Sequence, residues 1–296
     1  MSGVRGVVPM LVTPFAANGE VDERSLHRLV AHEIESGAHG LAALGLAGEG
    51  TYLSRDERAM VASFVVDGAG DIPVLIGCTA DSTQEAVALV EDASRIGASE
   101  VMVAPPRRPD WGPAEFREHY RQVAAAATCD VMVQDAPFAL GVELGVDLVL
   151  ALSEELPNVR SYKVEALPYW ENAVRARASA GVRLRVLGGH GGLYLLDVLD
   201  SAADGLIPGA DLTVKLVKAW DAYVAGSRDV AARIYSTLLP LLVYQAQSLG
   251  LLVGGAKTLL HARGIIETTV CRLPEAHITD VTRNRLVEIA EACGVY

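Results

Sequence analysis

The feature that most constrains this chain is a regular alternation of short apolar runs with longer amphipathic stretches. Their near-continuous apolar character is typical of strands buried on both faces of a sheet. The eight runs span residues 6–12, 40–45, 73–77, 100–105, 130–135, 159–165, 184–189 and 205–209. Eight strand-then-helix units predict a parallel (β/α)8 TIM barrel, because a doubly wound open sheet accommodates eight units less well.

The strand pattern stops after the eighth unit. Three helical stretches follow, at about 227–248, 250–264 and 279–294. We therefore expect a barrel over residues 1–225 and a C-terminal helical extension over residues 226–296 that packs on it. The most apolar stretch, residues 238–255, is interrupted by Pro240 and two glutamines, which predicts a buried or subunit-interface helix rather than a membrane span.

The composition of the chain limits the classes of partner and cofactor that it is expected to bind. The formal net charge is −12, and this acidic balance argues against nucleic acid or an anionic membrane as a partner. The four cysteines form no CxxC pair and the seven histidines show no metal-ligand spacing, so we expect neither a metal nor another cofactor. The first residues lack the pattern of a signal peptide, which favours a cytoplasmic location.

One lysine stands out. The chain has only four lysines, and Lys163 alone falls in a predicted strand, with Glu165 two residues on. Side chains two apart face the same way, and the strand ends here, at the end of the barrel where active sites are built. The pair is either a structural ion pair or a site where a buried amine attacks a carbonyl to form a Schiff base while the carboxylate moves a proton.

Two glycine-rich loops follow predicted strands. In GLAGE (45–49), the main-chain amides of Leu46 and Ala47 could bind a carboxylate, or the glycines could simply form a tight turn. In the loop around His190, four glycines leave the backbone open. His190 could contact a substrate hydroxyl or carry a proton, or it could merely fill the turn.

The order of motifs resembles one superfamily. The matching elements are TPF (13–15), GLAGE (45–49), Pro137, the lysine on the sixth strand, GG (188–189) and GLIPG (205–209). Together they resemble the dihydrodipicolinate synthase and N-acetylneuraminate lyase superfamily, over nearly the whole chain. The resemblance implies a (β/α)8 barrel of the class I aldolase and dehydratase type, in which Lys163 forms a Schiff base with a 2-oxo acid. It also implies a homo-oligomer, a tetramer or a dimer.

The sequence departs from that superfamily at four places, one of which is the stretch APPRRPDW (104–111), where the paired tyrosines usual after the fourth strand are replaced. Leu46 and Ala47 replace the usual hydroxyl residues between the glycines, and Gln134 stands where a tyrosine acid/base is usual. The arginine that dihydrodipicolinate synthases place after the proline is absent after Pro137. Dihydrodipicolinate synthase activity is therefore not expected.

The spacing of Lys163 and Glu165 resembles the branch that contains L-2-keto-3-deoxyarabonate dehydratase. This implies a 2-keto-3-deoxy sugar acid as substrate and loss of water as the reaction, with Glu165 as the base. The residues implied to bind the substrate are Leu46, Ala47, Gln134, Gly189 and His190. A pyruvate-dependent aldolase or lyase is the alternative enzyme, and a non-catalytic barrel that binds a keto acid is the alternative outside enzymes.

Overall fold

The computed structural model describes residues 3–295 and contains one sheet of eight parallel strands in the order β1-β8-β7-β6-β5-β4-β3-β2. The strands are β1 (Gly6–Val7), β2 (Leu41–Ala43), β3 (Val74–Gly77), β4 (Glu100–Val103), β5 (Asp130–Asp135), β6 (Val159–Val164), β7 (Arg185–Gly191) and β8 (Gly205–Pro208). Met10 closes the sheet, because it forms parallel bridges to both Ala42 of β2 and Gly209 after β8. The predicted TIM barrel is confirmed.

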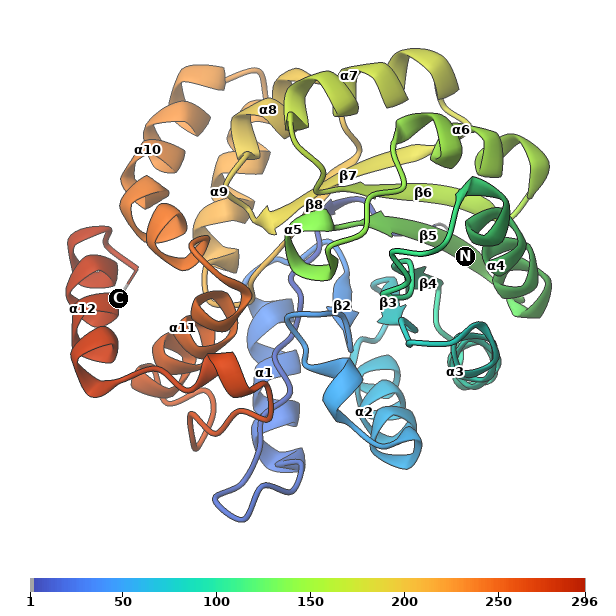
Figure 1. Ribbon diagram of the computed structural model, residues 1–296. Coiled ribbons are helices and arrows are strands. Elements are labelled where there is room, and N and C mark those ends of the chain that lie inside the picture. The colour runs from blue at the N-terminus through green and yellow to red at the C-terminus, as the bar shows by residue number, and fades with distance from the viewer. Residues whose placement is uncertain (1–2, 296) are drawn as a thin grey trace.

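Helices surround the strands (Figure 1). Those of the barrel are α1 (Glu23–Glu35), α2 (Arg55–Gly68), α3 (Thr83–Ile96), α4 (Pro113–Ala126), α5 (Pro137–Leu140), α6 (Val146–Glu155), α7 (Tyr169–Ala180), α8 (Leu195–Asp200) and α9 (Thr213–Val224). Ser54 and Glu57 form a capping box at the start of α2, and Ser82 caps α3. These caps satisfy main-chain N–H groups that a helix leaves unpaired at its beginning.

All eight predicted strands exist, with shifted ends. The first is shorter than the run over residues 6–12 because Pro9 has no N–H to donate to a ladder. β7 continues to Gly191, past the predicted end at 189. The short helix α5 was not predicted, and it lies over the C-terminal end of β5, near the centre of Figure 1.

The C-terminal extension consists of α10 (Arg228–Gln245), α11 (Leu249–Ala262) and α12 (Asp280–Ala292), which lie together on one side of the barrel (Figure 1). The apolar stretch 238–255 is divided between α10 and α11. Its Leu238, Leu241, Leu242 and Val253 side chains are buried, its other leucines are half-buried, and Val243 is 55% exposed. No helix among the described residues is long and apolar enough to cross a membrane. The boundary at residue 225, the assembly into oligomers and the cytoplasmic location stay predictions.

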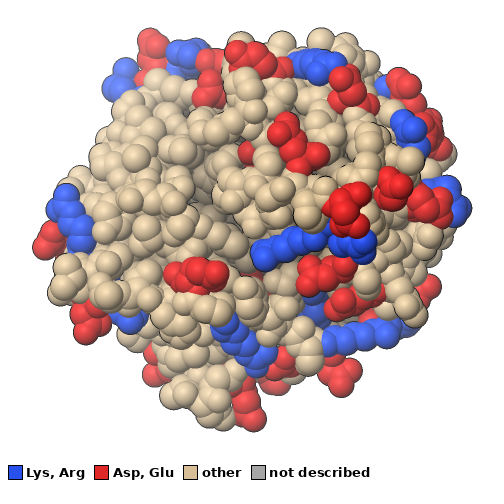
Figure 2. Space-filling view, viewed as in Figure 1, with Lys and Arg blue, Asp and Glu red and all other residues tan. Residues whose placement is uncertain are grey.

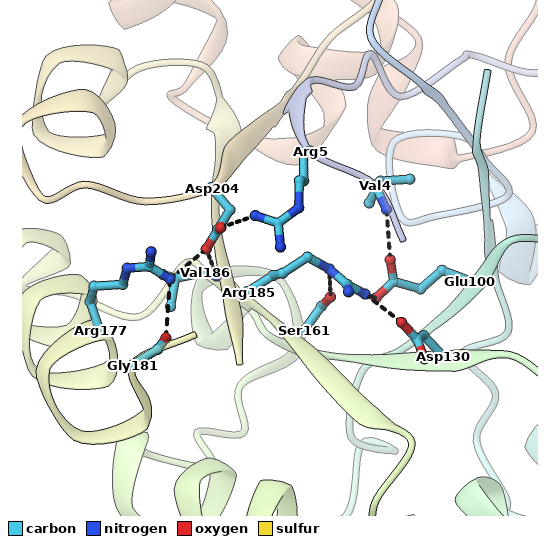
Figure 3. Close-up of polar contacts among 10 residues, drawn as sticks. All are labelled: Val4, Arg5, Glu100, Asp130, Ser161, Arg177, Gly181, Arg185, Val186 and Asp204. Carbon is cyan, nitrogen blue, oxygen red and sulfur yellow. Dashed lines mark hydrogen bonds and ion pairs between the residues drawn. The ribbon is translucent and has the colours of Figure 1, made fainter. Parts of the chain in front are cut away.

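Charged residues cluster at the N-terminal ends of the strands, opposite the end that carries Lys163 (Figure 3). Arg185 at the start of β7 contacts Glu100 at 3.1 Å and Asp130 at 2.8 Å, and its Nε donates to Ser161 Oγ at 3.0 Å. Burial raises the pKa of Glu100, against the attraction of Arg185. This network joins four neighbouring strands, β4 to β7, so its function is structural rather than catalytic.

A buried acid on α1 predicts how stability depends on pH. Burial raises the pKa of Glu33 from 4.5 to about 8, against the opposing effects of Thr213 and Arg263. Between these two pH values the folded chain holds a proton that the unfolded chain has released, so stability falls as pH rises, by at most about 1.4 kcal/mol per pH unit. Glu33→Gln mimics the protonated acid. We therefore expect it to match the wild type at pH 5 and to be more stable by a few kcal/mol near pH 9.

Urea unfolding of both proteins across this pH range measures the difference. Glu35→Gln is the matched control, because Glu35 lies on the same helix and is exposed. It should leave the pH dependence unchanged. Parallel stability curves for the wild type and Glu33→Gln would contradict the prediction.

Candidate active site

Lys163 and Glu165 lie together at the C-terminal end of β6. Lys163 Nζ is 3.4 Å from Glu165 Oε2, and the residues are 6% and 4% exposed. The position follows from the sequence, because residues two apart on a strand face the same side and β6 ends at Val164. The geometry places an amine and a carboxylate side by side at the mouth of the barrel.

The carboxylate of Glu165 is held at both oxygens. Gln134 Nε2, on β5, donates to Oε2 at 2.6 Å, and the main-chain N–H of His190 donates to Oε1 at 3.0 Å. Burial alone would raise the pKa of Glu165, but the charges of Lys163 and His190 and these two hydrogen bonds hold the pKa below 4.5. Glu165 is therefore ionised at neutral pH, as a proton acceptor must be.

The loop after β7 explains why glycines accompany His190. A Cβ atom on Gly189 would lie 2.1 Å from Glu165 Oε1, so only glycine lets the backbone approach the carboxylate this closely. His190 itself has a left-handed φ of 52°, and its Nε2 donates to the main-chain oxygen of Glu165 at 2.6 Å. Its ring packs 4.6 Å from that of Phe138. The structure thus brings Gly189 and His190 against Glu165.

A pocket opens over these residues, with about 370 Å³ of empty space that includes some open solvent. It is lined by Met10, Leu46, Ala47, Gln134, Phe138, Lys163, Glu165, Gly191, Ile207, Pro208, Gly209, Leu249 and Leu252. The lining includes Lys163, Glu165, Gln134, Leu46 and Ala47, which the sequence analysis proposed. Gly189 and His190 do not line the pocket, but they contact Glu165, which does.

The loop that carries Leu46 and Ala47 lines the pocket. Among the described residues, neither of these N–H groups donates a hydrogen bond within the chain. The loop is fixed from below, because Thr13 Oγ1 donates to Gly48 O at 2.7 Å. Two free N–H groups in a fixed loop are suited to bind a carboxylate.

A buried ion pair that the sequence did not predict lies behind this loop. Glu49, the last residue of GLAGE, pairs with Lys257 of α11, and both side chains are fully buried. Glu49 also accepts hydrogen bonds from the main chain of Arg272 at 2.6 Å and Leu273 at 2.8 Å. The rarity of lysine was the available signal, but the partner is 208 residues away in sequence. These contacts fix the GLAGE loop (45–49) to the C-terminal extension.

The hydrophobic part of the pocket was not predicted from the sequence either. Leu249 and Leu252 come from α11 and Phe138 from α5, and all three line the pocket. No local pattern distinguishes them from ordinary core residues. Within residues 3–295 no group of three or more His, Cys, Asp or Glu side chains is arranged to hold a metal ion.

Comparison with known proteins identifies the family. The model of the dihydrodipicolinate synthetase family matches residues 3–293, almost the entire chain. The chain belongs to this family of lyases. The family assignment confirms the resemblance in motif order, and it leaves the reaction of this member to be decided by its own pocket.

Relatives within the family differ in their reactions. The chain is 30% identical over 295 residues to the L-2-keto-3-deoxyarabonate dehydratase of Azospirillum brasilense, covering 97% of this chain and 93% of that protein. It is 34% identical to the 4-hydroxy-tetrahydrodipicolinate synthase of Salinibacter ruber, but over 54% of this chain and 53% of that protein. The crystal structure of dihydrodipicolinate synthase from Rhodopseudomonas palustris superimposes with a TM-score of 0.91 at 27% identity, covering 98% and 97% of the two chains.

Proposed function

We propose that this protein is a Schiff-base-forming dehydratase of a 2-keto-3-deoxy sugar acid. The observation that carries the proposal is the buried carboxylate of Glu165, 3.4 Å from Lys163 Nζ and held by Gln134. Glutamine cannot exchange protons near neutral pH, so Glu165 is the acid/base group in the pocket. The similarity to the Azospirillum dehydratase over almost the full length supports the same reading.

Substrate capture uses the two free N–H groups and the lysine. The carboxylate of the substrate binds the amides of Leu46 and Ala47, which places its C2 ketone over β6. The Lys163 amine adds to C2, and water leaves to form the iminium. Gly189 and the main-chain N–H of His190 keep Glu165 beside the new C=N bond.

Elimination follows from the position of Glu165. Its carboxylate removes a C3 proton, and the C–H electrons move toward the iminium to give an enamine. The enamine expels the C4 hydroxyl, which leaves as water with the proton returned by Glu165. Addition of water at C2 then breaks the C–N bond and frees Lys163 and a dehydrated 2-oxo acid. The net change is the loss of one water molecule.

Gln134 binds the C4 hydroxyl in this proposal. Its Nε2 donates to Glu165, and its buried Oε1 has no hydrogen-bond partner. A buried amide oxygen without a partner is costly, and a substrate hydroxyl would satisfy it. The dihydrodipicolinate synthase reaction is not expected here, because the tyrosine and arginine that the superfamily uses are absent from this pocket.

Product analysis tests the proposal directly. We expect racemic 2-keto-3-deoxypentonate to lose water and to yield a single dehydrated five-carbon 2-oxo acid, identified by NMR and mass spectrometry. Pyruvate among the products would indicate the lyase instead. Imine formation on Lys163 without turnover of any 2-keto-3-deoxy acid would indicate a binding protein.

A further inference from the structure

The pocket has a polar wall and an apolar wall. Its polar side chains are Gln134, Lys163 and Glu165, all from β5 and β6. The apolar wall comes from β8, the residue that follows it and α11. It is formed by Ile207, Pro208, Gly209, Leu249 and Leu252. On the face seen in Figure 2 the molecule is hollowed near its centre, and the surface to the left of the hollow, on the side where Figure 1 shows α10 and α11, is mostly uncharged.

Each polar side-chain group in the pocket already has a partner or an assigned atom of the substrate. Glu165 Oε1 accepts from His190, and Oε2 accepts from Gln134. Lys163 is needed at C2, and Gln134 Oε1 is the acceptor for the C4 hydroxyl. Among the described residues that line the pocket, no other side chain offers a hydrogen bond to a hydroxyl beyond C4.

The carboxylate of Asp211, which lies near the pocket, does not offer such a hydrogen bond either. Asp211 approaches the pocket behind Gly209, where a Cβ atom would lie 2.6 Å from Asp211 Oδ1. However, Asp211 is 2% exposed and does not line the pocket. Its Oδ2 accepts from Gln245 at 2.8 Å. Asp211 is therefore occupied inside the fold and does not reach a substrate.

We infer that this site, besides the sugar acid, dehydrates a further and better substrate, which carries a hydrocarbon group instead of a hydroxylated one beyond C4. It is a short 4-hydroxy-2-oxo acid whose carboxylate, ketone and C4 hydroxyl are bound by polar groups and whose far end packs on Leu249, Leu252 and Ile207. This inference rests on the proposed function, because C2 must sit at Lys163.

A matched pair of substrates tests the inference. In 4-hydroxy-2-oxohexanoate a terminal methyl group replaces the C5 hydroxyl of 2-keto-3-deoxypentonate, so the two acids have nearly the same size. With both used as C4 racemates, we expect kcat/KM for dehydration to be about 10- to 100-fold higher for the hexanoate, the range a hydrophobic pocket achieves against a hydroxyl. Equal values, or a preference for the pentonate, would overturn the inference.

Variants of α11 test whether its apolar residues cause this substrate preference. Leu252→Gln places a hydrogen-bonding side chain in the apolar wall and should reduce the preference at least about tenfold. Leu251→Gln is the control, because Leu251 is on the same helix but does not line the pocket, and the preference should persist. An unchanged preference in Leu252→Gln would count against this wall as its source.

Trapping with pyruvate and borohydride distinguishes failure of the inference about the apolar end from failure of the proposed Schiff-base function. If the wild type and both leucine variants are labelled at Lys163 but the hexanoate is not preferred, the inference about the apolar end fails while the Schiff-base chemistry stands. If Lys163 is not labelled in the wild type, the proposed function fails and the inference falls with it.

Discussion

Lys163→Ala is expected to lose all labelling by pyruvate and borohydride, and turnover should fall by about 10³-fold or more, because the nucleophile that captures the substrate is gone. The chain has only four lysines, so peptide mapping assigns any label without ambiguity. Intact mass and peptide mass spectrometry after reduction provide the measurement. A Lys163→Ala protein that still incorporates pyruvate would end the Schiff-base proposal.

Two further variants make this result specific. Removing Lys163 leaves the carboxylate of Glu165 buried without its cation, which costs several kcal/mol and can unfold the protein. Lys163→Arg keeps a positive charge beside Glu165 but offers no amine of suitable reactivity, so it should fold and still escape labelling. Lys218→Ala removes an exposed lysine from α9 and should behave as the wild type.

Glu165→Gln is expected to keep the Schiff base and lose the dehydration step. A general base typically contributes ~10²–10⁴-fold, so single-turnover rates should fall at least about a hundredfold. The fold should tolerate the change, because Gln134 can turn its amide over and let Oε1 accept from the new NH2 group. Normal turnover in a folded Glu165→Gln protein would reject Glu165 as the base. Glu171→Gln, exposed on α7, is the control.

The pH profile distinguishes a base from a structural ion pair. The pKa of Glu165 is held below 4.5, so the wild-type rate should stay on its plateau through neutral pH and decline only below the ordinary carboxyl range. In Glu165→Gln that decline should vanish together with the rate. A structural ion pair would instead change thermal stability and leave the rate per folded molecule near normal.

The sequence by itself predicted the architecture, because a barrel strand is a local pattern. Runs of five to seven mostly apolar residues, separated by amphipathic helices, define each β/α unit without knowledge of the others. The place of Lys163 and Glu165 at a strand end follows from the same local pattern and the two-residue repeat of a strand. The family resemblance then supplied the chemistry that we propose for these residues.

The tertiary structure decided what surrounds that pair. Gln134, 31 residues away in sequence, reaches Glu165 only because β5 and β6 are neighbours in the sheet. The apolar wall from Leu249 and Leu252, and the ion pair between Glu49 and Lys257, depend on how α11 docks on the barrel. Such contacts arise from packing between distant segments, which no local pattern encodes. The fold, the family and the place of the Lys163–Glu165 pair were therefore readable from the sequence, whereas the shape and polarity of the pocket around that pair emerged only in three dimensions.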